Sequence, residues 1–355
     1  MNRKNNKRVY VGVSGGVDSS VALYLLKKQG YDVTGVFIKT WHPDWLPCTE
    51  PEDRLSAIKV CAELEVPFLE LDAKEEYKRG VADRMIADYK AGRTPNPDVL
   101  CNREVKFGIF YKWAKEQGAD FVATGHYARS EDGKLLMGKD SSKDQSYFLW
   151  MIDTDILPNV LFPIGNLEKK GVRKIAERAG LHTFKRKDSQ GVCFLGDIDI
   201  KDFLSHYIEK KTGNVIVEGG QVVGEHDGIN FYTVGERHGF RILPEYNTGE
   251  PFYITKKDVA NNVLYVSKQN PLISSDNKLS AFYLEEVNFF SKNLPDKFEG
   301  LCRVRHLGEL HKATVTKEGD KFKVELKDSE SISPGQSAVI YMGDELILGG
   351  IISSL

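Results

Sequence analysis

Short apolar runs alternate with helical patterns from residue 9 to residue 124, and this alternation limits the possible folds more than any other feature. Residues 9–13 have the pattern of a buried strand, and residues 17–28 have helical periodicity. Strands that alternate with helices imply parallel crossovers, so we expect a doubly wound α/β sheet. Ligands of such sheets bind beyond the carboxyl ends of the strands. The turn after Val13, the segment after Ile38 and the turn at Gly125 should therefore meet in one crevice.

The pattern changes near residue 208, where the helical periodicity ends. Short β-like runs separated by glycine turns follow, and a Ser-rich stretch after Asn270-Pro271 divides them into two sets. A chain of 355 residues also exceeds what one core usually supports. We therefore expect three domains: an α/β domain with a helical extension (1–208), a small central β-rich domain (209–272) and a β-barrel (273–355).

The net charge of −2 lacks the basic excess of most nucleic-acid-binding proteins. Residues 169–187 nevertheless hold eight Lys and Arg side chains against the single acid Glu177. This cluster is either a solvated helix face, the commoner origin of a charge run, or a surface for nucleic-acid phosphates.

The five cysteines form no CxxC pair, which argues against a zinc or iron–sulfur site, so we predict no metal ligated by this chain alone. The sequence has no apolar run long enough to span a bilayer and no signal-peptide pattern. We expect a cytoplasmic protein with no membrane partner.

A glycine-rich loop lies between the first predicted strand and the first predicted helix. Glycines let backbone N–H groups approach phosphate oxygens, and the helix N-terminus adds a favourable dipole. The loop is neither a Walker A motif nor a dinucleotide GxGxxG motif. Its SGGxDS pattern resembles the PP-loop of ATP pyrophosphatases; the alternative is a tight Gly-Gly turn with Asp18 as helix N-cap. The loop comprises Gly12, Val13, Ser14, Gly15, Gly16, Val17, Asp18 and Ser19.

Two of the cysteines lie in settings that favour a reactive thiolate. Cys101 follows a proline-rich stretch and should lie in a loop near the N-terminus of a helix that begins close to Arg103, where the dipole lowers a thiol pKa. Cys193 follows the basic residues 185–187 and has Gly191 and Gly196 on either side. The alternative for each cysteine is a buried, inert thiol.

Seven motifs, in order from Ser14 to Tyr341, resemble the tRNA-specific 2-thiouridylase family. They are SGGVDSS, PNPDVLCNREVKF, ATGHYAR, KDQSYFL, DSQGVCFLG, YTVGERHGF and SPGQSAVIY. The resemblance implies a PP-loop ATP pyrophosphatase domain followed by a central β-rich adaptor domain and a C-terminal β-barrel. Two positions depart from the family pattern: Thr40, where Asn is usual, and Glu236, where Gln is usual.

The resemblance implies a reaction in which ATP, with Mg²⁺, adenylates the C2 oxygen of a tRNA wobble uridine, and sulfur then replaces that oxygen. Cys193 would carry a persulfide, Cys101 would free its sulfur and end in a disulfide with Cys193, and Asp98 would act as general acid/base. The partners would be the anticodon region of tRNA and a persulfide donor, either a sulfur carrier protein or a cysteine desulfurase. The ATP site would comprise Gly12 to Ser19, Ile38 and Gly125, and the tRNA contacts Asn96, Pro97, Asp98, His126, Lys143, Asp144, Gln145, Arg305, His306 and Gln336.

Two other readings of the residues remain open. A PP-loop ligase that adenylates a small molecule would keep residues 14–19 but would need neither Cys101 nor Cys193. An RNA-binding or sulfur-carrier protein with a relict nucleotide site would not convert ATP to AMP.

Overall fold

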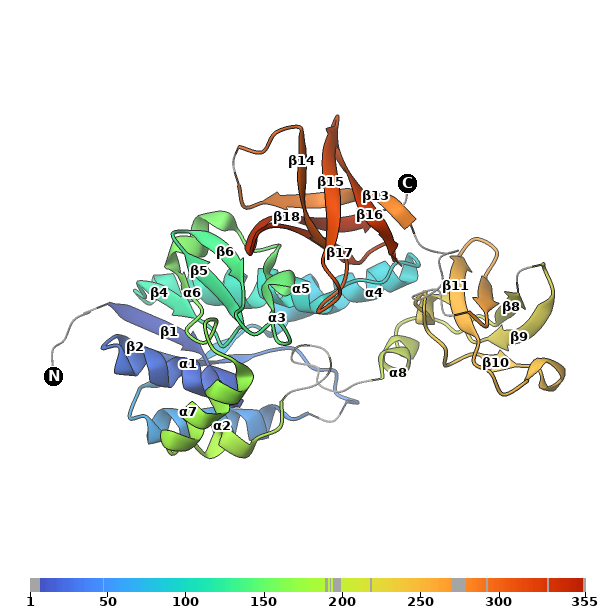
Figure 1. The fold of residues 1–355 in the computed structure, drawn as a ribbon. Coiled ribbons are helices and arrows are strands. Elements are labelled where there is room, and N and C mark those ends of the chain that lie inside the picture. Colours follow the sequence, from blue (N-terminus) through green and yellow to red (C-terminus); the bar gives the residue numbers. More distant parts are fainter. Residues whose placement is uncertain are drawn as a thin grey trace.

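The computed structural model describes most of the chain between residues 7 and 353. The described ranges are 7–46, 48–188, 191, 193, 199–217, 219–269, 279–291, 293–330 and 332–353. The predicted boundary around Asn270-Pro271 lies outside them. Figure 1 shows an α/β domain, a β-barrel that lies against it, and a β-rich domain at the far end beyond the short helix α8 (Ile200–Ser205).

The α/β domain contains a five-stranded parallel sheet with helices on both faces, so the doubly wound fold is confirmed. Val9 and Val11 pack into one core with the helices of one face, whereas Tyr10 between them packs into the core on the other face. The strand order is β3 (Phe68–Asp72), β2 (Asp32–Lys39), β1 (Arg8–Gly12), β4 (Phe121–Ala123) and β7 (Val160–Leu161).

Three longer helices cover the first face: α1 (Val17–Lys28), α2 (Glu50–Glu63) and α7 (Lys169–Arg178). Two continuous helical segments cover the second face, and each contains a π-helical stretch. They are α3 (Lys74–Tyr77), η1 (Lys78–Ala82) and α4 (Asp83–Lys90), then α5 (Pro97–Cys101), η2 (Asn102–Ile109) and α6 (Phe110–Glu116). Short 3-10 turns complete the domain: η3 (Ser146–Leu149), η4 (Thr154–Asn159) and η5 (His182–Lys185).

The helix that carries Cys101 begins earlier than the sequence suggested. We expected it near Arg103, but it begins at Pro97. Proline is well suited to the first helical position, and the side-chain oxygen of Asn96 caps the helix by accepting a bond of 3.3 Å from the Val99 N–H. Cys101 therefore lies within a helix and not in a loop before one.

The central domain is a five-stranded sheet in the order β10 (Arg241–Ile242), β9 (Val222–His226), β8 (Gly213–Val217), β12 (Val263–Ser267) and β11 (Tyr253–Asp258). Two 3-10 turns, η6 (Ile229–Phe231) and η7 (Pro244–Tyr246), complete it. Tyr232 packs in the core and is only 1% exposed.

The C-terminal strands form the expected closed barrel, because the first strand pairs with the last. Their order is β13 (Leu279–Phe289), β16 (Lys321–Glu330), β15 (His311–Glu318), β14 (Lys297–Arg303), β17 (Ser337–Met342) and β18 (Glu345–Ser353). The sequence did not indicate a hairpin from the α/β domain, β5 (Ala128–Glu131) and β6 (Lys134–Met137), that joins this sheet through β18. Within the described ranges, no helix is long and apolar enough to cross a membrane.

Candidate active site

The glycine-rich loop lies between β1 and α1, at the carboxyl edge of the parallel sheet. Gly15 has a φ of +75°, and a Cβ there would lie 2.4 Å from the Asp53 carbonyl oxygen, so the turn requires glycine. The Ser19 hydroxyl accepts a 3.2 Å bond from the Ser14 N–H. Asp18 is not the N-cap, a position that Gly16 holds. The Asp18 carboxylate instead accepts bonds of 2.7 Å from the Tyr127 hydroxyl and 2.7 Å from the Lys169 ammonium.

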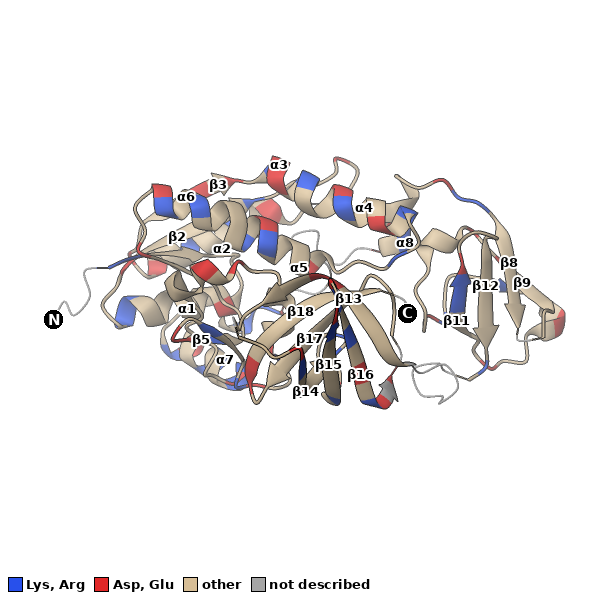
Figure 2. Ribbon diagram, turned by 90° about the horizontal axis from the view of Figure 1, so that it is seen from above, with Lys and Arg blue, Asp and Glu red and all other residues tan. Residues whose placement is uncertain are grey.

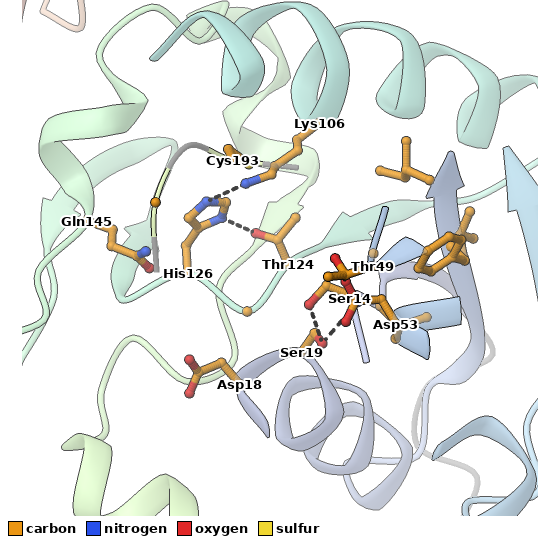
Figure 3. A pocket seen from close by; sticks show the side chains of 17 residues that line it. Ser14, Asp18, Ser19, Thr49, Asp53, Lys106, Thr124, His126, Gln145 and Cys193 are labelled. Carbon is orange, nitrogen blue, oxygen red and sulfur yellow. Dashed lines mark hydrogen bonds between the residues drawn. The ribbon is translucent and has the colours of Figure 1, made fainter. Parts of the chain in front are cut away.

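A cavity of about 320 Å³ opens beside this loop, and its labelled side chains form two groups in Figure 3. Ser14, Ser19 and Asp53 lie on one side, and Cys193 and His126 lie on the other. The predicted ATP residues that line the cavity are Gly12, Val13, Ser14, Asp18, Ser19, Ile38 and Gly125; Gly15, Gly16 and Val17 are not among its lining residues.

The two predicted reactive cysteines lie next to each other on the side of the cavity that holds His126. The sulfur atoms of Cys101 and Cys193 are 3.4 Å apart, although the residues are 92 positions apart in sequence. Cys193 lines the cavity, whereas Cys101 behind it has no exposed surface. Two contacts hold Cys193: its N–H donates to the Asp98 carboxylate at 3.0 Å, and the Tyr77 hydroxyl donates to its carbonyl oxygen at 2.8 Å.

The electrostatics assign the two thiols opposite roles. Burial raises the pKa of Cys101 well above its ordinary value, so the expected thiolate at this residue is wrong. Because the helix begins at Pro97, Cys101 also lies beyond the first turn, to which the effect of the dipole is confined. The pKa of Cys193 is lowered, first because the Cys101 thiol donates to its sulfur and next because the Lys106 ammonium lies close by. Burial also raises the pKa of Asp98, against the bond from the Cys193 N–H. Cys193 is thus the more acidic thiol of the pair.

Lys106 and Thr124 are two lining residues that the sequence analysis did not select. The Lys106 ammonium lies 3.5 Å from Nε2 of His126, and the Thr124 hydroxyl lies 2.7 Å from Nδ1 of the same ring. Burial first, and then the nearby ammonium, lower the pKa of His126 well below its ordinary value, so the ring is neutral. The spacing of Lys106, five positions after Cys101, was the signal that could have revealed it.

The basic segment from 169 to 187 has two parts. Lys169, Arg173 and Arg186 point inward: Lys169 bonds Asp18, and Arg186 donates to the Gly15 carbonyl oxygen at 2.8 Å and pairs with Asp53. Lys169 and Arg186 therefore help to hold the glycine-rich loop, whereas Arg173 donates to the Phe184 and Arg186 carbonyl oxygens. The other five remain exposed, namely Lys170, Lys174, Arg178, Lys185 and Lys187.

Some of the predicted tRNA contacts lie at or near the cavity. His126 and Gln145 line it, while Asn96 and Pro97 begin the helix that carries Asp98 and Cys101. Lys143 lies 3.4 Å from the Asp188 carboxylate.

Other predicted tRNA contacts lie where the barrel meets the α/β domain. Gln336 donates to the Thr94 carbonyl oxygen at 2.9 Å, Arg305 bonds Glu330 at 2.6 Å, and the His306 ring packs on Phe148 at 4.2 Å. Asp144 is placed differently. It is 1% exposed and pairs with Arg303 at 2.7 Å, so its carboxylate has no surface for RNA in this conformation.

Three family models match successive parts of the chain. The "tRNA methyl transferase HUP domain" matches residues 7–197, the "tRNA methyl transferase PRC-barrel domain" residues 201–268 and the "Aminomethyltransferase beta-barrel domain" residues 279–352. Among solved structures, a 4-thiouridine synthetase–RNA complex with bound ATP covers 53% of this chain and 44% of its own at 22% identity, with a TM-score of 0.35. The U34-tRNA thiolase NcsA of Methanococcus maripaludis covers 57% and 65% at 18% identity, with a TM-score of 0.34.

Curated relatives match the chain from end to end. The tRNA-specific 2-thiouridylase MnmA of Streptococcus sanguinis is 42% identical over 99% of this chain and 96% of its own. The enzyme of the same name from Bacillus subtilis is also 42% identical with the same coverage, and that from Lysinibacillus sphaericus is 44% identical over 98% and 94%. The chain belongs to the tRNA-specific 2-thiouridylase family.

Proposed function

We propose that this protein transfers AMP from ATP to the C2 oxygen of a tRNA wobble uridine and then replaces that oxygen with sulfur carried on Cys193. The observation that carries the proposal is the pair of thiols, 3.4 Å apart, of which Cys193 lines the same cavity as the phosphate loop. A single cavity that offers both a loop suited to anions and a thiol of lowered pKa suits adenylation followed by sulfur attack.

The loop residues fit a nucleotide. A Cβ at Gly125 would lie 2.7 Å from the Ser19 N and 2.8 Å from the Asp18 carbonyl carbon, so the glycine leaves this turn open beside the loop. The N–H groups from Gly12 to Ser19 would hold phosphate oxygens. Mg²⁺ would lie near Asp18 and would offset charge on the leaving pyrophosphate. Among the described residues, no group of three His, Cys, Asp or Glu side chains could hold a metal ion.

The sulfur steps follow from the two thiols. The outer persulfide sulfur on Cys193 attacks C2 of the adenylated uridine, and the C2–O bond breaks with its electron pair on AMP. Cys101 then attacks the sulfur of Cys193, the bond between Cys193 and the transferred sulfur breaks, and its electron pair remains on the 2-thiouridine. A Cys101–Cys193 disulfide forms, which the 3.4 Å separation makes feasible with little movement.

The uridine must leave the anticodon stack to reach this cavity. The proposed contacts near the base are Asn96 and Pro97, while Arg305, His306 and Gln336 offer contacts at the edge of the barrel. Figure 2 shows basic and acidic residues interleaved over the α/β domain and the barrel, so we expect the tRNA to be held by local contacts and by shape.

A persulfide donor, either a sulfur carrier protein or a cysteine desulfurase, would load Cys193. We propose a cytoplasmic location, because the reaction needs reduced thiols and tRNA.

The contact between Cys101 and Cys193 favours this function over a ligase for small molecules and over a methyl transferase. A ligase for small molecules would need neither thiol. The "methyl transferase" in the family-model descriptions names a different chemistry, which would also leave the contact between Cys101 and Cys193 without a role.

The test is mass spectrometry of nucleosides from tRNA incubated with the protein, ATP and a persulfide donor. The wild type should form 2-thiouridine, AMP and pyrophosphate, and Cys193→Ser should form AMP without 2-thiouridine. Free sulfide must be absent, because at high concentration it could bypass Cys193. A methylated nucleoside, or 2-thiouridine formed by Cys193→Ser, would refute the proposal.

A further inference from the structure

The helix that carries Cys101 continues into a π-helical stretch, η2, that starts at the next residue. In an α-helix, residues on one face are three or four positions apart. In a π-helix the hydrogen bond spans five positions, so a residue five places on returns above the first. Lys106 is five positions after Cys101 and is thereby brought toward the thiols. Gly108 permits the winding, because a Cβ there would lie 2.6 Å from the Arg103 carbonyl oxygen.

Charged and titratable groups from several elements face the Lys106 ammonium. It forms a hydrogen bond with the Cys193 side chain and lies 3.5 Å from the neutral ring of His126. Burial works to lower the pKa of Lys106, but negative charge on the thiol pair and on Asp98, together with the hydrogen bond to Cys193, outweighs it and holds the pKa above its ordinary value. Tyr77, from α3, stays protonated because burial raises its pKa, and its hydroxyl donates to the Cys193 carbonyl oxygen. Lys106 is thus a cation beside two thiols of opposite acidity.

We propose that Lys106 is a catalytic cation that serves the two thiols in turn. It first stabilises the anionic sulfur on Cys193 while sulfur is loaded and delivered, and it then stabilises the Cys101 thiolate that frees the transferred sulfur. This inference rests on the proposed thiolation, because only that reaction uses both thiols in sequence.

The second role follows from the change at Cys193 during the reaction. Once the persulfide sulfur is bonded to C2, the sulfur of Cys193 is part of a neutral disulfide bond and no longer draws the ammonium. Cys101, which burial otherwise keeps protonated, then becomes the group that the charge of Lys106 can ionise. The Cys101 proton passes to the Asp98 carboxylate. The Cys101 sulfur bonds to Cys193 as the bond between Cys193 and the transferred sulfur breaks, with the electron pair left on that sulfur.

A small mixed disulfide at Cys193 isolates this second step from ATP, tRNA and the donor. Methyl methanethiosulfonate should convert Cys193, which lines the cavity, to its S-methylthio form, whereas Cys101 has no exposed surface. Attack by Cys101 then forms the Cys101–Cys193 disulfide and releases methanethiolate. Peptide mass spectrometry follows the loss of the S-methylthio group and the appearance of the bridge as a function of pH.

We expect Lys106→Gln to slow this release at pH 7 by about tenfold or more and to move its pH midpoint upward by about one unit or more, as loss of a neighbouring charge does. Lys106→Arg should recover most of the rate. Lys112→Gln, an exposed lysine on α6, is the matched control and should behave as the wild type. Thermal melting of each variant shows that it is folded. Release by folded Lys106→Gln with the wild-type rate and pH profile would overturn the proposal.

A second pair of variants tests the first role of Lys106 without the Cys101 donor, and it uses methionine in case glutamine at position 106 prevents folding. In Cys101→Ala the thiol donor to Cys193 is gone, and the ammonium remains; in Cys101→Ala, Lys106→Met the charge is gone as well. Alkylation of Cys193 should have a pH midpoint about one unit or more lower in the first variant than in the second. Equal midpoints in the two folded variants would overturn the first role of Lys106. If the Lys106 variants show both effects but the wild type makes no 2-thiouridine, the proposed function is refuted, while the role of Lys106 toward the two thiols is retained.

Discussion

The two sides of the cavity are built by different physical means. One side is the glycine-rich loop, residues 12–19. It consists of consecutive backbone groups, and ion pairs from Lys169 and Arg186 hold it in place. The thiol side consists of side chains from distant segments, and the acidity of its thiols depends on the hydrogen bond between them, on burial and on one ammonium. Because separate contacts hold the two sides, adenylation and sulfur transfer should fail independently of each other.

The largest effect is expected from disabling the nucleotide side alone. In Gly125→Ala the new Cβ would lie 2.7 Å from the Ser19 backbone nitrogen, so the loop must move. ATP-dependent AMP formation should fall more than tenfold, while alkylation of Cys193 should keep its pH profile. Gly171→Ala is the control, since a Cβ there meets nothing within 4 Å. Wild-type AMP formation by Gly125→Ala would contradict the assignment of the loop.

Disabling the thiol side alone should produce the converse result. Cys101→Ser should still convert ATP to AMP in the presence of tRNA and should accumulate sulfur on Cys193, because the release step lacks its thiol. Peptide mapping after turnover without reductant should find the Cys101–Cys193 bridge in the wild type. Cys48→Ser, at an exposed cysteine, is the control. A double Cys101→Ser, Cys193→Ser variant that still thiolates tRNA from a persulfide donor would exclude the relay.

The contact between the α/β domain and the barrel can be weakened without changing a residue on either side of the cavity. Asp144 and Arg303 form an ion pair of 2.7 Å between the α/β domain and the barrel, with side chains 1% and 7% exposed. Asp144→Ala leaves a buried guanidinium without its counter-charge, so we expect a loss of about 3–5 kcal/mol in the free energy of unfolding, measured with urea. Lys134→Gln, which removes an exposed partner of Glu345, should change the urea midpoint little. Equal urea midpoints for the two variants would show that the buried ion pair does not stabilise the folded protein.

The smallest effect is expected on the exposed part of the basic segment, outside both sides of the cavity. If Lys174 and Arg178 contact tRNA phosphates, replacing each with Gln should reduce the slope of log affinity against log salt by about 0.7–0.9 per contact. The measurement is tRNA binding over a series of salt concentrations. An unchanged slope would identify this surface as a solvated helix face.

The local parts of the fold followed from the sequence. The first helix has the predicted bounds Val17–Lys28, because an apolar stripe and a glycine turn define it within a few residues. The β5–β6 hairpin was missed, because its pairing with β18 joins residues more than 200 positions apart, and a short alternating run does not specify a distant partner.

The site shows the same limit. The sequence indicated Cys101 and Cys193, but burial reversed the expected acidity of Cys101, and burial is a property of tertiary packing. Lys106 was not selected as a site residue, because helical periodicity assumes that residues of one face are three or four positions apart, whereas η2 is π-helical.

The hairpin has a consequence for how the molecule could be divided. The Met137 N–H donates to the Asp344 carbonyl oxygen at 2.8 Å, and the Trp150 indole and Tyr147 hydroxyl both bond Ser337 at 2.8 Å. The barrel is therefore attached to the α/β domain by a shared sheet and buried hydrogen bonds, independently of the chain that leads to it through the central domain. Two separate polypeptides, divided between residues 269 and 279, should reassemble into one particle when they are expressed together.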